Sequence, residues 1–358
     1  MGVVISGGSY LNIFNSYLAL TKPRVVVLLQ ITALCSVLVH NLLNNSLDIR
    51  TIEIMGVVFV GGYLTAGGAN AVNMWYDRDI DPLMSRTSSR PIPRGDISPA
   101  KSLYFGILLC FTGIIWFVIF SNGVAAFWAL FSILFYVFIY SFWLKRTTVQ
   151  NIVIGGIAGS TPPLIGWAVA ESNLSIELES ISSLFLSLFN LGSTIPWMMF
   201  LLIFLWTPPH FWALALFRSE EYEKVGVPMM PGVRGAERTI SEMKIYSILL
   251  ILLSLIFPLS YGLEYTSEEY YFLGGFAVLF SFLYAKTIWR IDINEELDEK
   301  GVIPSALHSF LFSMKYLAII FFLLVAISAE TIGMILFFVG ISIMYFNDNG
   351  YFSLGNES

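Results

Sequence analysis

The sequence predicts an all-α membrane protein, a polytopic helical bundle of about nine transmembrane helices around a central cavity open to the cytoplasmic side. Composition gives the first reason, because the 358-residue chain is 56% hydrophobic and 12% charged, far more apolar than soluble domains. Its apolar residues also form runs long enough to cross a bilayer. Its charged residues gather between these runs, mostly on one side of the predicted membrane.

Runs of ~17 to 25 apolar residues mark the individual helices. We place them at residues 25–43, 53–74, 102–121, 124–144, 151–170, 195–217, 245–262, 270–289 and 307–328. The chain then divides into a cytoplasmic N-terminal arm (1–24), an intramembrane domain (25–328) and a C-terminal extension (329–358). The extension contains a short apolar stretch, 331–346, which fits either an extra helix or a surface element.

Positive charge sets the orientation. If the N-terminus is cytoplasmic, nearly all of the 19 Lys and Arg residues lie at the inner side, and Arg50 is the exception in an outer loop. The N-terminus has no Arg-rich presequence and no small-residue cleavage site, which favours a bacterial or archaeal cell (inner) membrane. We therefore expect a multi-pass protein with its active site facing the cytoplasm. The pI near 5.2 and the lack of a basic soluble domain argue against nucleic acid as a partner.

The second predicted helix ends in the most informative stretch of the chain. Asn73, Asp77 and Asp81 are spaced i, i+4, i+8, so on a continuing helix they share one face while Asp79 points elsewhere. Carboxylates at a membrane edge are costly without a partner. Mg²⁺ keeps several waters and takes one or two carboxylates together with phosphate oxygens. The row therefore predicts a magnesium diphosphate site, and a solvated helix end is the weaker explanation of the spacing.

Arginines lie within and just beyond this row, at Arg78, Arg86, Arg90 and Arg94. Planar guanidinium groups suit bidentate contacts to phosphate. Ordinary positive-inside arginines explain them equally well. For the arginines alone, both interpretations stay open.

Two proline pairs are expected to break the fifth and sixth predicted helices at depth, Pro162–Pro163 and Pro208–Pro209. The fifth helix follows a basic turn, opens with Asn151 and carries Gly155 and Gly159, a spacing typical of close helix packing. His210 follows the second proline pair. Its imidazole could ligate iron or act as a base, or it could bond a carbonyl that the prolines free, and sequence alone does not choose between these roles.

A second charged inner loop follows the sixth predicted helix and contains Arg218, Glu221 and Tyr222. Charged loops after the second and sixth helices suggest two related bundles that meet around one cavity, although a solvated loop also explains the glutamates. The outer loop 171–194 contains the apolar run ISSLFLSLFNLG, which fits a helix on the membrane surface.

Four segments of the chain resemble a known family: LTKPRV, NMWYDRDIDPLMSRTSSRP, LKRTTVQNIVIGGIAGSTPPLIGW and WTPPHFWALALFRSEEYEKVGVPM. They are similar to the hallmark segments of the protoheme IX farnesyltransferases (heme O synthases), within the UbiA-type intramembrane prenyltransferase superfamily. The resemblance runs in order over about residues 20–328. One departure is that Glu220 and Glu221 stand where many superfamily members have a second D-x-x-x-D motif, which leaves the number of Mg²⁺ ions open.

The resemblance implies transfer of the farnesyl group of farnesyl diphosphate to a vinyl group of protoheme IX (heme B), with addition of water and release of diphosphate. It implies that Asn73, Asp77 and Asp81 hold Mg²⁺, while Arg86 and Arg90 act on the leaving diphosphate. Heme is then a substrate rather than a cofactor, reached with farnesyl diphosphate from the lipid bilayer. Further substrate-binding residues are expected at Lys145, Arg146, Asn151, His210, Glu221 and Tyr222. Whether the chain works beside a heme A synthase stays open.

Two rival functions are weighed against this one. A prenyltransferase for a quinone or lipid precursor would share the first acidic motif, but the Pro-Pro-His segment and the form of the second loop speak against it. A transporter would carry ionisable groups near the bilayer midplane. In this chain they lie almost entirely at the predicted inner edge, which favours an enzyme.

Overall fold

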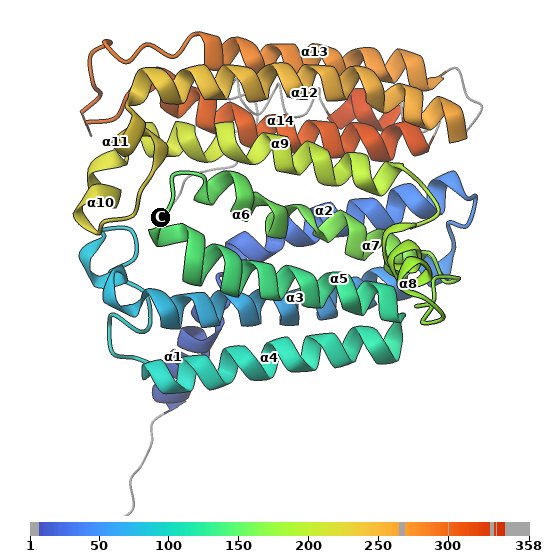
Figure 1. Ribbon diagram of the computed structural model, residues 1–358, viewed down its shortest axis with the longest axis horizontal. Helices are drawn as coiled ribbons and strands as arrows, with labels where there is room; N and C mark the ends of the chain where they lie inside the picture. The colour runs from blue at the N-terminus through green and yellow to red at the C-terminus, as the bar shows by residue number, and fades with distance from the viewer. Residues whose placement is uncertain (1–6, 265–268, 300, 330–332, 334, 341–358) are drawn as a thin grey trace, which may run out of the picture.

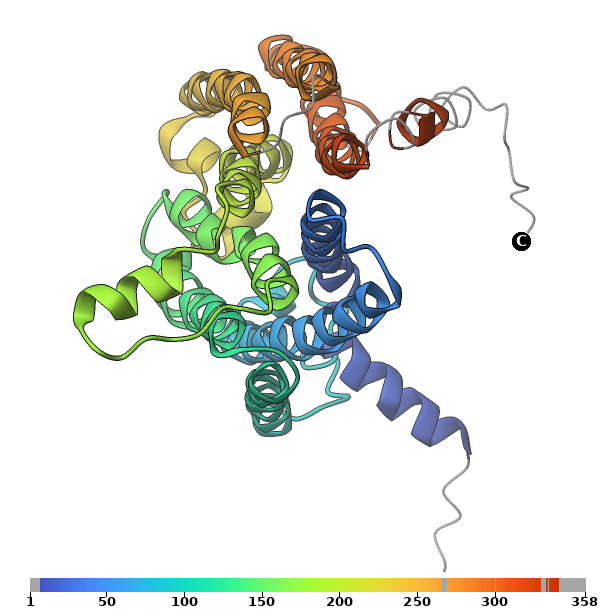
Figure 2. The ribbon, with the colours of Figure 1, turned by 90° about the vertical axis from the view of Figure 1, so that its right-hand side faces the viewer.

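The computed structural model describes residues 7–264, 269–299, 301–329, 333 and 335–340, and within them it contains helices and no strand. Most helices run roughly side by side across the molecule (Figure 1). Turned by 90°, they are seen end-on and form a ring (Figure 2). The described helices confirm the predicted all-α class.

The first half of the chain contains the first five predicted transmembrane segments, and the fifth of these is broken. Its elements are α1 (Gly7–Leu20), α2 (Pro23–Leu43), α3 (Ile49–Tyr76), the 3₁₀ turns η1 (Asp77–Asp79) and η2 (Asp81–Leu83), α4 (Pro99–Phe120), α5 (Gly123–Leu134), the π-helical η3 (Phe135–Trp143), the 3₁₀ turn η4 (Leu144–Arg146), α6 (Asn151–Ser160) and α7 (Pro162–Ala170). The second half closes the ring. It consists of α8 (Ile181–Phe189), α9 (Ile195–Leu216), α10 (Ser219–Lys224), α11 (Met230–Arg234), α12 (Ala236–Glu264), α13 (Glu269–Trp289) and α14 (Pro304–Ser328).

Each of the nine predicted transmembrane segments falls on helix. Eight described helical stretches are long and apolar enough to cross a membrane, and Gly274–Trp289 within α13 is a shorter apolar one. The helix α8 occurs where the outer loop was predicted to form one. The predicted stretch 331–346 lies largely outside the described residues, although 335–340 are helical.

Local sequence signals explain where several helices begin. Asp48 and Thr51 form a capping box at the start of α3. Ser98 caps α4, which opens with Pro99, and Asn122 caps α5. These caps satisfy backbone N–H groups that the first helical turn leaves without partners.

The fifth transmembrane segment is broken at Pro162, as predicted, and its halves pack against different neighbours. The half that follows η4, α6, packs on α9 and η3, whereas α7 packs mainly on α2 and α5. Gly166 makes the α7–α2 contact possible, because a Cβ there would lie 2.2 Å from the Ala33 carbonyl oxygen. The second predicted break is wrong: α9 runs continuously through Pro208–Pro209.

The predicted small-residue packing holds at one of its two glycines. A Cβ at Gly155 would lie 2.3 Å from the Tyr140 ring, so η3 depends on this glycine for its close approach. No atom lies within 4 Å of a Cβ built at Gly159. The glycine pair is therefore not one continuous packing face.

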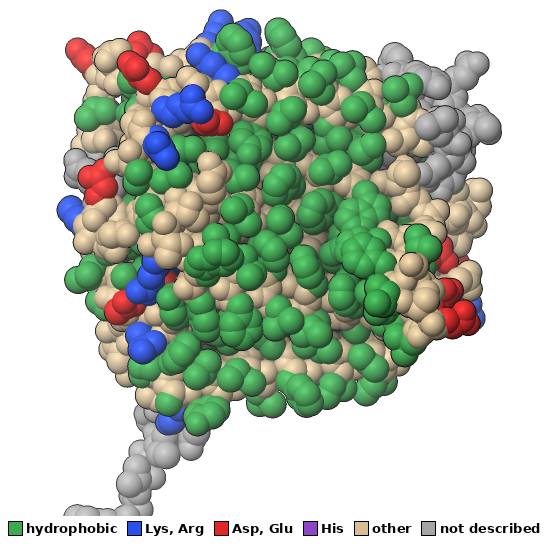
Figure 3. Space-filling view, viewed as in Figure 1, with side chains coloured by type: hydrophobic (Ala, Val, Ile, Leu, Met, Phe, Trp, Pro, Cys, Tyr) green, Lys and Arg blue, Asp and Glu red, His purple; other side chains and the backbone are tan. Residues whose placement is uncertain are grey.

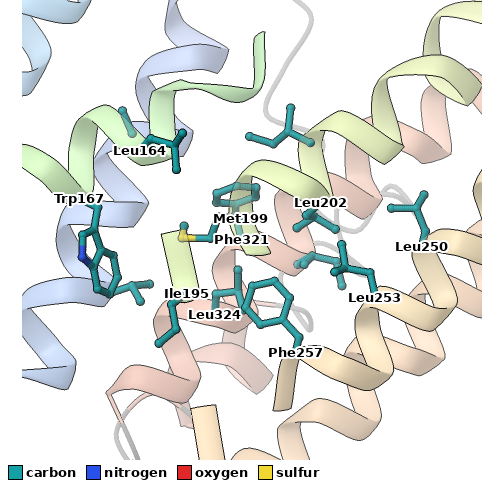
Figure 4. Close-up of a cluster of buried hydrophobic side chains, with 14 of the residues drawn as sticks. Leu164, Trp167, Ile195, Met199, Leu202, Leu250, Leu253, Phe257, Phe321 and Leu324 are labelled. Carbon is teal, nitrogen blue, oxygen red and sulfur yellow. The ribbon is translucent and has the colours of Figure 1, made fainter. Parts of the chain in front are cut away.

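The main hydrophobic core extends along the bundle from Met230 and Met243 to Trp167, and it joins α7, α9, α12 and α14. Figure 4 shows Trp167, Met199, Phe257 and Phe321 meeting there. In Figure 3 the middle of the molecule presents apolar side chains, whereas Lys and Arg gather at the end that carries α10 and α11.

Candidate active site

The acidic row lies where α3 ends. We expected a continuing helix, but α3 stops at Tyr76 and the chain goes on as the 3₁₀ turns η1 and η2. Pro82 has no N–H to continue an α-helix, which accounts for the tighter turns. The predicted facing survives this change, because Asp77 and Asp81 are 0% and 2% exposed while the Asp79 side chain is 58% exposed. Asn73, one turn earlier, is also buried.

Asp77 is held by the basic turn that follows η3. Its Oδ2 accepts a hydrogen bond from Lys145 Nζ, and its Oδ1 lies 3.7 Å from Arg146 Nη2. Oδ1 is buried and accepts no hydrogen bond from a described residue. Arg146 itself pairs with Asp79 at 2.7 Å and lies over the Tyr76 ring. The predicted basic turn thus faces the acidic row.

Asp81 is held by its own loop. Both of its carboxylate oxygens accept from Arg90 Nη1 at 2.8 Å. The Thr87 hydroxyl donates to the Asp81 carbonyl oxygen at 2.8 Å, which folds the loop back onto η2. Arg90 therefore belongs to the site.

The other three arginines of this region lie apart from the row. Arg86 is exposed and makes no hydrogen bond to a described residue, but its charge acts on Glu221. Arg78 lies over the Trp75 ring, 4.9 Å from the centroid. Arg94 pairs with Asp96 at the surface. Arg78 and Arg94 thus fit ordinary surface arginines.

Sequence reasoning missed Lys22, which completes the cluster. Lys22 Nζ donates to Asn73 Oδ1 at 2.6 Å. The residue stands between α1 and α2 with φ 52°, a left-handed conformation uncommon outside glycine. Burial lowers the pKa of Lys22 to about 7, with Arg90 lowering it further and Asp77 opposing the decrease. A lysine directly before Pro23, at the start of a membrane helix, was the available signal.

A second missed feature is the π-helical segment η3, which carries polar side chains under the row. Asn73 Nδ2 donates to Ser141 Oγ at 3.0 Å. Tyr136 donates to Asn70 Oδ1 at 3.3 Å, and Asn70 in turn donates to the Thr21 carbonyl. π-helical turns often occur at functional sites. Two tyrosines and a serine within an apolar run were the sequence signal.

The two charged loops meet, as predicted. Ser85 Oγ donates to Glu221 Oε1 at 2.8 Å, and Arg218 donates to the same oxygen at 2.7 Å. Partial burial raises the pKa of Glu221, but these two hydrogen bonds outweigh it and hold the pKa below its usual value. Beneath them Ile80 and Ile152 pack with Tyr222 in a small hydrophobic cluster. Glu221 and Tyr222 therefore contact the segment that contains Ile80 and Ser85, which continues from the acidic row.

Asn151 ties the basic turn to the second loop. It is 1% exposed, and its Nδ2 donates to the carbonyl oxygen of Pro228 at 3.0 Å. A longer contact of 3.5 Å reaches the Lys145 carbonyl oxygen. Its Oδ1 is buried and accepts no hydrogen bond from a described residue.

His210 lies six residues before the end of α9. The loops that follow α3 and α9 are bonded to each other. His210 is therefore near the same end of the bundle as the acidic row. Its ring is stacked between Trp206 and Phe310, with centroids 4.2 and 4.7 Å away. Nδ1 lies 2.5 Å from Ser313 Oγ. Because the Ser313 hydroxyl also lies within hydrogen-bond distance of the Phe310 carbonyl oxygen, the arrangement fits the tautomer in which Nδ1 donates to Ser313 and Nε2 carries the lone pair. The alternative of a bond to a freed carbonyl is not found among the described hydrogen bonds.

Comparison with known proteins identifies the family of the chain. Residues 29–311 match the UbiA prenyltransferase family. The chain is 40% identical over 311 residues to a protoheme IX farnesyltransferase of Bartonella tribocorum, covering 86% of this chain and 88% of that protein. It is 45% identical over 241 residues to a protoheme IX farnesyltransferase of Symbiobacterium thermophilum, covering 67% and 72%.

Solved structures share the fold at lower sequence identity. One comes from work on digeranylgeranylglyceryl phosphate synthase in membranes, with a TM-score of 0.65, 17% identity, and coverage of 89% of this chain and 99% of that one. Another is a UbiA homologue from Archaeoglobus fulgidus bound to DMAPP and Mg²⁺, with a TM-score of 0.57, 16% identity, and coverage of 88% and 99%. The chain belongs to the UbiA prenyltransferase family, in the group that contains the protoheme IX farnesyltransferases.

Proposed function

We propose that this protein is a heme O synthase. It transfers the farnesyl group of farnesyl diphosphate to a vinyl group of protoheme IX, adds water and releases diphosphate. The similarity to proteins named protoheme IX farnesyltransferase supports the choice of both substrates. The observation that carries the proposal is the buried row of Asn73, Asp77 and Asp81, surrounded by Lys and Arg side chains at one end of the bundle.

The row suits Mg²⁺. Two carboxylates and an amide leave coordination positions for water and phosphate oxygens, as this ion prefers. Asp77 Oδ1 supports the fit, because it is buried and accepts no hydrogen bond from a described residue. Among the described residues no group of three or more His, Cys, Asp or Glu side chains offers an alternative metal centre. When bound by Asn73, Asp77 and Asp81, Mg²⁺ would neutralise charge on the leaving diphosphate.

The surrounding cations hold the diphosphate and stabilise it as it leaves. Lys145 pairs with Asp77, and Arg90 pairs with Asp81. Both cations therefore lie within reach of a diphosphate that these carboxylates would hold through a metal. Arg86 is exposed on the loop beside Glu221, and we assign it to the outer edge of the diphosphate site. As the C–O bond of the donor breaks, its electron pair goes to the diphosphate, and fixed positive charges lower the energy of that state.

The acceptor step follows in the apolar surroundings of the bundle. The π electrons of the vinyl group form a bond to the allylic carbon, which leaves a cation on the porphyrin side. Water adds there and loses one proton, which the released diphosphate accepts, so atoms and charge balance. Tyr136 and Tyr140 are on η3, whose Ser141 is bonded to Asn73 of the row, and Tyr222 packs near Ile80, so we assign these tyrosines to the surroundings of the acceptor.

We assign the heme iron to His210. Its Nε2 keeps a lone pair and has no hydrogen-bond partner among the described residues, while Nδ1 is fixed by Ser313. A neutral imidazole whose second nitrogen donates a hydrogen bond is the usual state of a metal-ligating histidine. Trp206 and Phe310 hold the ring in place. The basic residues at this end of the bundle support a cytoplasmic position for the site.

The direct test uses purified protein in lipid nanodiscs with heme B, farnesyl diphosphate and Mg²⁺, with and without EDTA. Chromatography and mass spectrometry of the hemes should find heme O only when metal is present. Heme bound without any product, with farnesyl diphosphate intact, would overturn the proposal. Parallel incubations with quinone precursors would then test the rival acceptors.

A further inference from the structure

The short helix α8 is fastened to the bundle by tryptophans from three different transmembrane helices, α5, α7 and α9. Their indole N–H groups donate to carbonyl oxygens at or just beyond the end of α8. The pairs are Trp128 with Leu188 at 3.0 Å, Trp167 with Leu191 at 3.1 Å and Trp197 with Phe189 at 3.1 Å. Carbonyl groups in the last turn of a helix have no partner within the helix. The tryptophans therefore both satisfy the end of α8 and fix its position.

One face of α8 presents apolar side chains that no described residue covers. Ile181 and Phe185 are 86% and 62% exposed, and their i, i+4 spacing places them on the same side of the helix. Phe189 follows one turn later and stacks on Phe185 and Trp197, with centroids 4.5 and 5.9 Å away. A continuous apolar face of this kind indicates contact with lipid or with another protein.

The opposite face of α8 is covered by the loop that precedes the helix. Ser187 Oγ accepts a hydrogen bond from the Glu177 N–H at 3.1 Å, and Ser183 forms a capping box with Ser180. Glu177 and Glu179 lie on this loop and are exposed. The helix thus separates an acidic loop from an apolar face.

The orientation of α8 favours lipid as the cover of the apolar face. The helix projects sideways from the ring, across the direction of the transmembrane helices (Figures 1 and 2). It lies at the end of the bundle opposite α10 and α11 (Figure 1). Acidic side chains gather at that end, beside the apolar middle of the molecule (Figure 3). An amphipathic helix in this orientation has one face among acyl chains and the other in water.

We infer that α8 lies in the bilayer surface opposite the acidic row, with Ile181 and Phe185 among the acyl chains and the preceding acidic loop in water. Helices of this kind often use Lys and Arg to bind anionic lipids, but residues 147–217 contain neither. The contact therefore depends on apolar burial rather than on charge. Through the three tryptophans it sets the membrane depth of α9, which carries His210, and of α5, which continues into η3.

Spin labelling measures this position directly. In full-length protein with Cys35 and Cys110 replaced by alanine, a nitroxide is attached at Ile181→Cys, Phe185→Cys or Glu179→Cys in phosphatidylcholine nanodiscs. EPR power saturation then compares collisions with O₂, which concentrates in the bilayer, and with a water-soluble nickel chelate. We expect the Ile181→Cys and Phe185→Cys labels to collide more with O₂, and the Glu179→Cys label to collide more with nickel.

Reference positions and lipid composition sharpen the comparison. Leu108→Cys, on the exposed surface of α4, gives the signal of a side chain in the lipid interior, and Phe185→Cys should fall between it and Glu179→Cys. Replacing part of the phosphatidylcholine with anionic phosphatidylglycerol should leave these depths unchanged. A clear shift in depth would contradict binding by apolar burial alone.

Two other results would overturn the lipid contact. Equal access of nickel to Phe185→Cys and Glu179→Cys would place α8 in water. Protection of both Ile181→Cys and Phe185→Cys from O₂ and nickel would mean that a protein covers the apolar face, either a second copy of this chain or a partner.

The tryptophan anchor has a test of its own. Replacing Trp128 and Trp197 together by phenylalanine keeps aromatic rings but removes two N–H donors, so the label at Phe185→Cys should become more mobile and its EPR lines narrower. Trp116→Phe, which removes a donor bonded to Val57 on α3, is the matched control and should leave the spectrum unchanged. An unchanged spectrum in the double variant would overturn the anchoring role of these bonds.

Discussion

Ser85, in the loop after η2, donates a hydrogen bond of 2.8 Å to Glu221, which lies 136 residues further along the chain. This contact joins the loop of the acidic row to the loop after α9. It therefore couples the two halves of the ring at the end where we place the diphosphate. Because the contact lies at the surface, we expect it to position the two loops and to add little to the stability of the fold.

Breaking this contact should weaken donor binding. We expect Ser85→Ala and Glu221→Ala each to raise the KM for farnesyl diphosphate by roughly two- to tenfold with a smaller effect on kcat. The double variant should be no worse than the poorer single one, since both remove the same contact. Steady-state kinetics measure this, with exposed Glu237→Ala as the control. Additive losses would contradict a shared role.

Asp77 and Asp79 form a matched pair of opposite exposure. Asp77→Asn should lower heme O formation by about 10³-fold or more, because it removes a charge from the proposed metal ligand set. Asp79→Asn should cost less than about tenfold, as its side chain is 58% exposed and pairs with Arg146. Heme O yield and the thermal unfolding midpoint are measured together. Equal losses in both variants would argue against a special role for Asp77.

The Ser313 hydroxyl should control the spectrum of bound heme. Without its acceptor oxygen, Nδ1 of His210 loses the hydrogen bond that fixes the tautomer, so Ser313→Ala should shift the heme absorption bands and the iron–histidine Raman band. Ser313→Thr keeps a hydroxyl and should restore them. His210→Ala should abolish the iron–histidine band. An unchanged spectrum in His210→Ala would remove His210 from the heme site.

Two glycines of the fifth transmembrane segment should respond in opposite ways to alanine. Gly166→Ala places a Cβ 2.2 Å from the Ala33 carbonyl oxygen and should destabilise the protein by about 1–3 kcal/mol. Gly159→Ala meets no atom within 4 Å and should be neutral or stabilising by up to about 1 kcal/mol. Thermal unfolding in detergent compares them. A stable Gly166→Ala variant would mean that α7 can move away from α2.

Hydropathy predicted the membrane helices because the length of a span is set by the bilayer, not by its neighbours. The spacing of Asn73, Asp77 and Asp81 predicted their common facing even though the backbone turned out to be 3₁₀ rather than α. Residue type and period were sufficient for these features. The family resemblance, rather than residue type or period, implied that Lys145 and Arg146 of the basic turn bind substrate.

Other features depend on contacts between distant segments and could not be read locally. Lys22 reaches Asn73 only because α1 and α2 meet at a left-handed residue. Arg78 and Arg94 have the same side chain as Arg90, and their positions are decided by Trp75 and Asp96. Helix α9 continues through two prolines and packs on α12, α6 and α14, contacts that the local sequence does not contain.

The break at Pro162 has a bearing on the membrane as a whole. All residues of α7 are buried, and this half-helix is wedged against α2 with a backbone contact that leaves no room even for a methyl group. The proposed chemistry brings water and a charged leaving group into the bundle from one side only. We expect the filled half-helix α7 to keep water that enters from the side of the acidic row from passing along the fifth transmembrane segment.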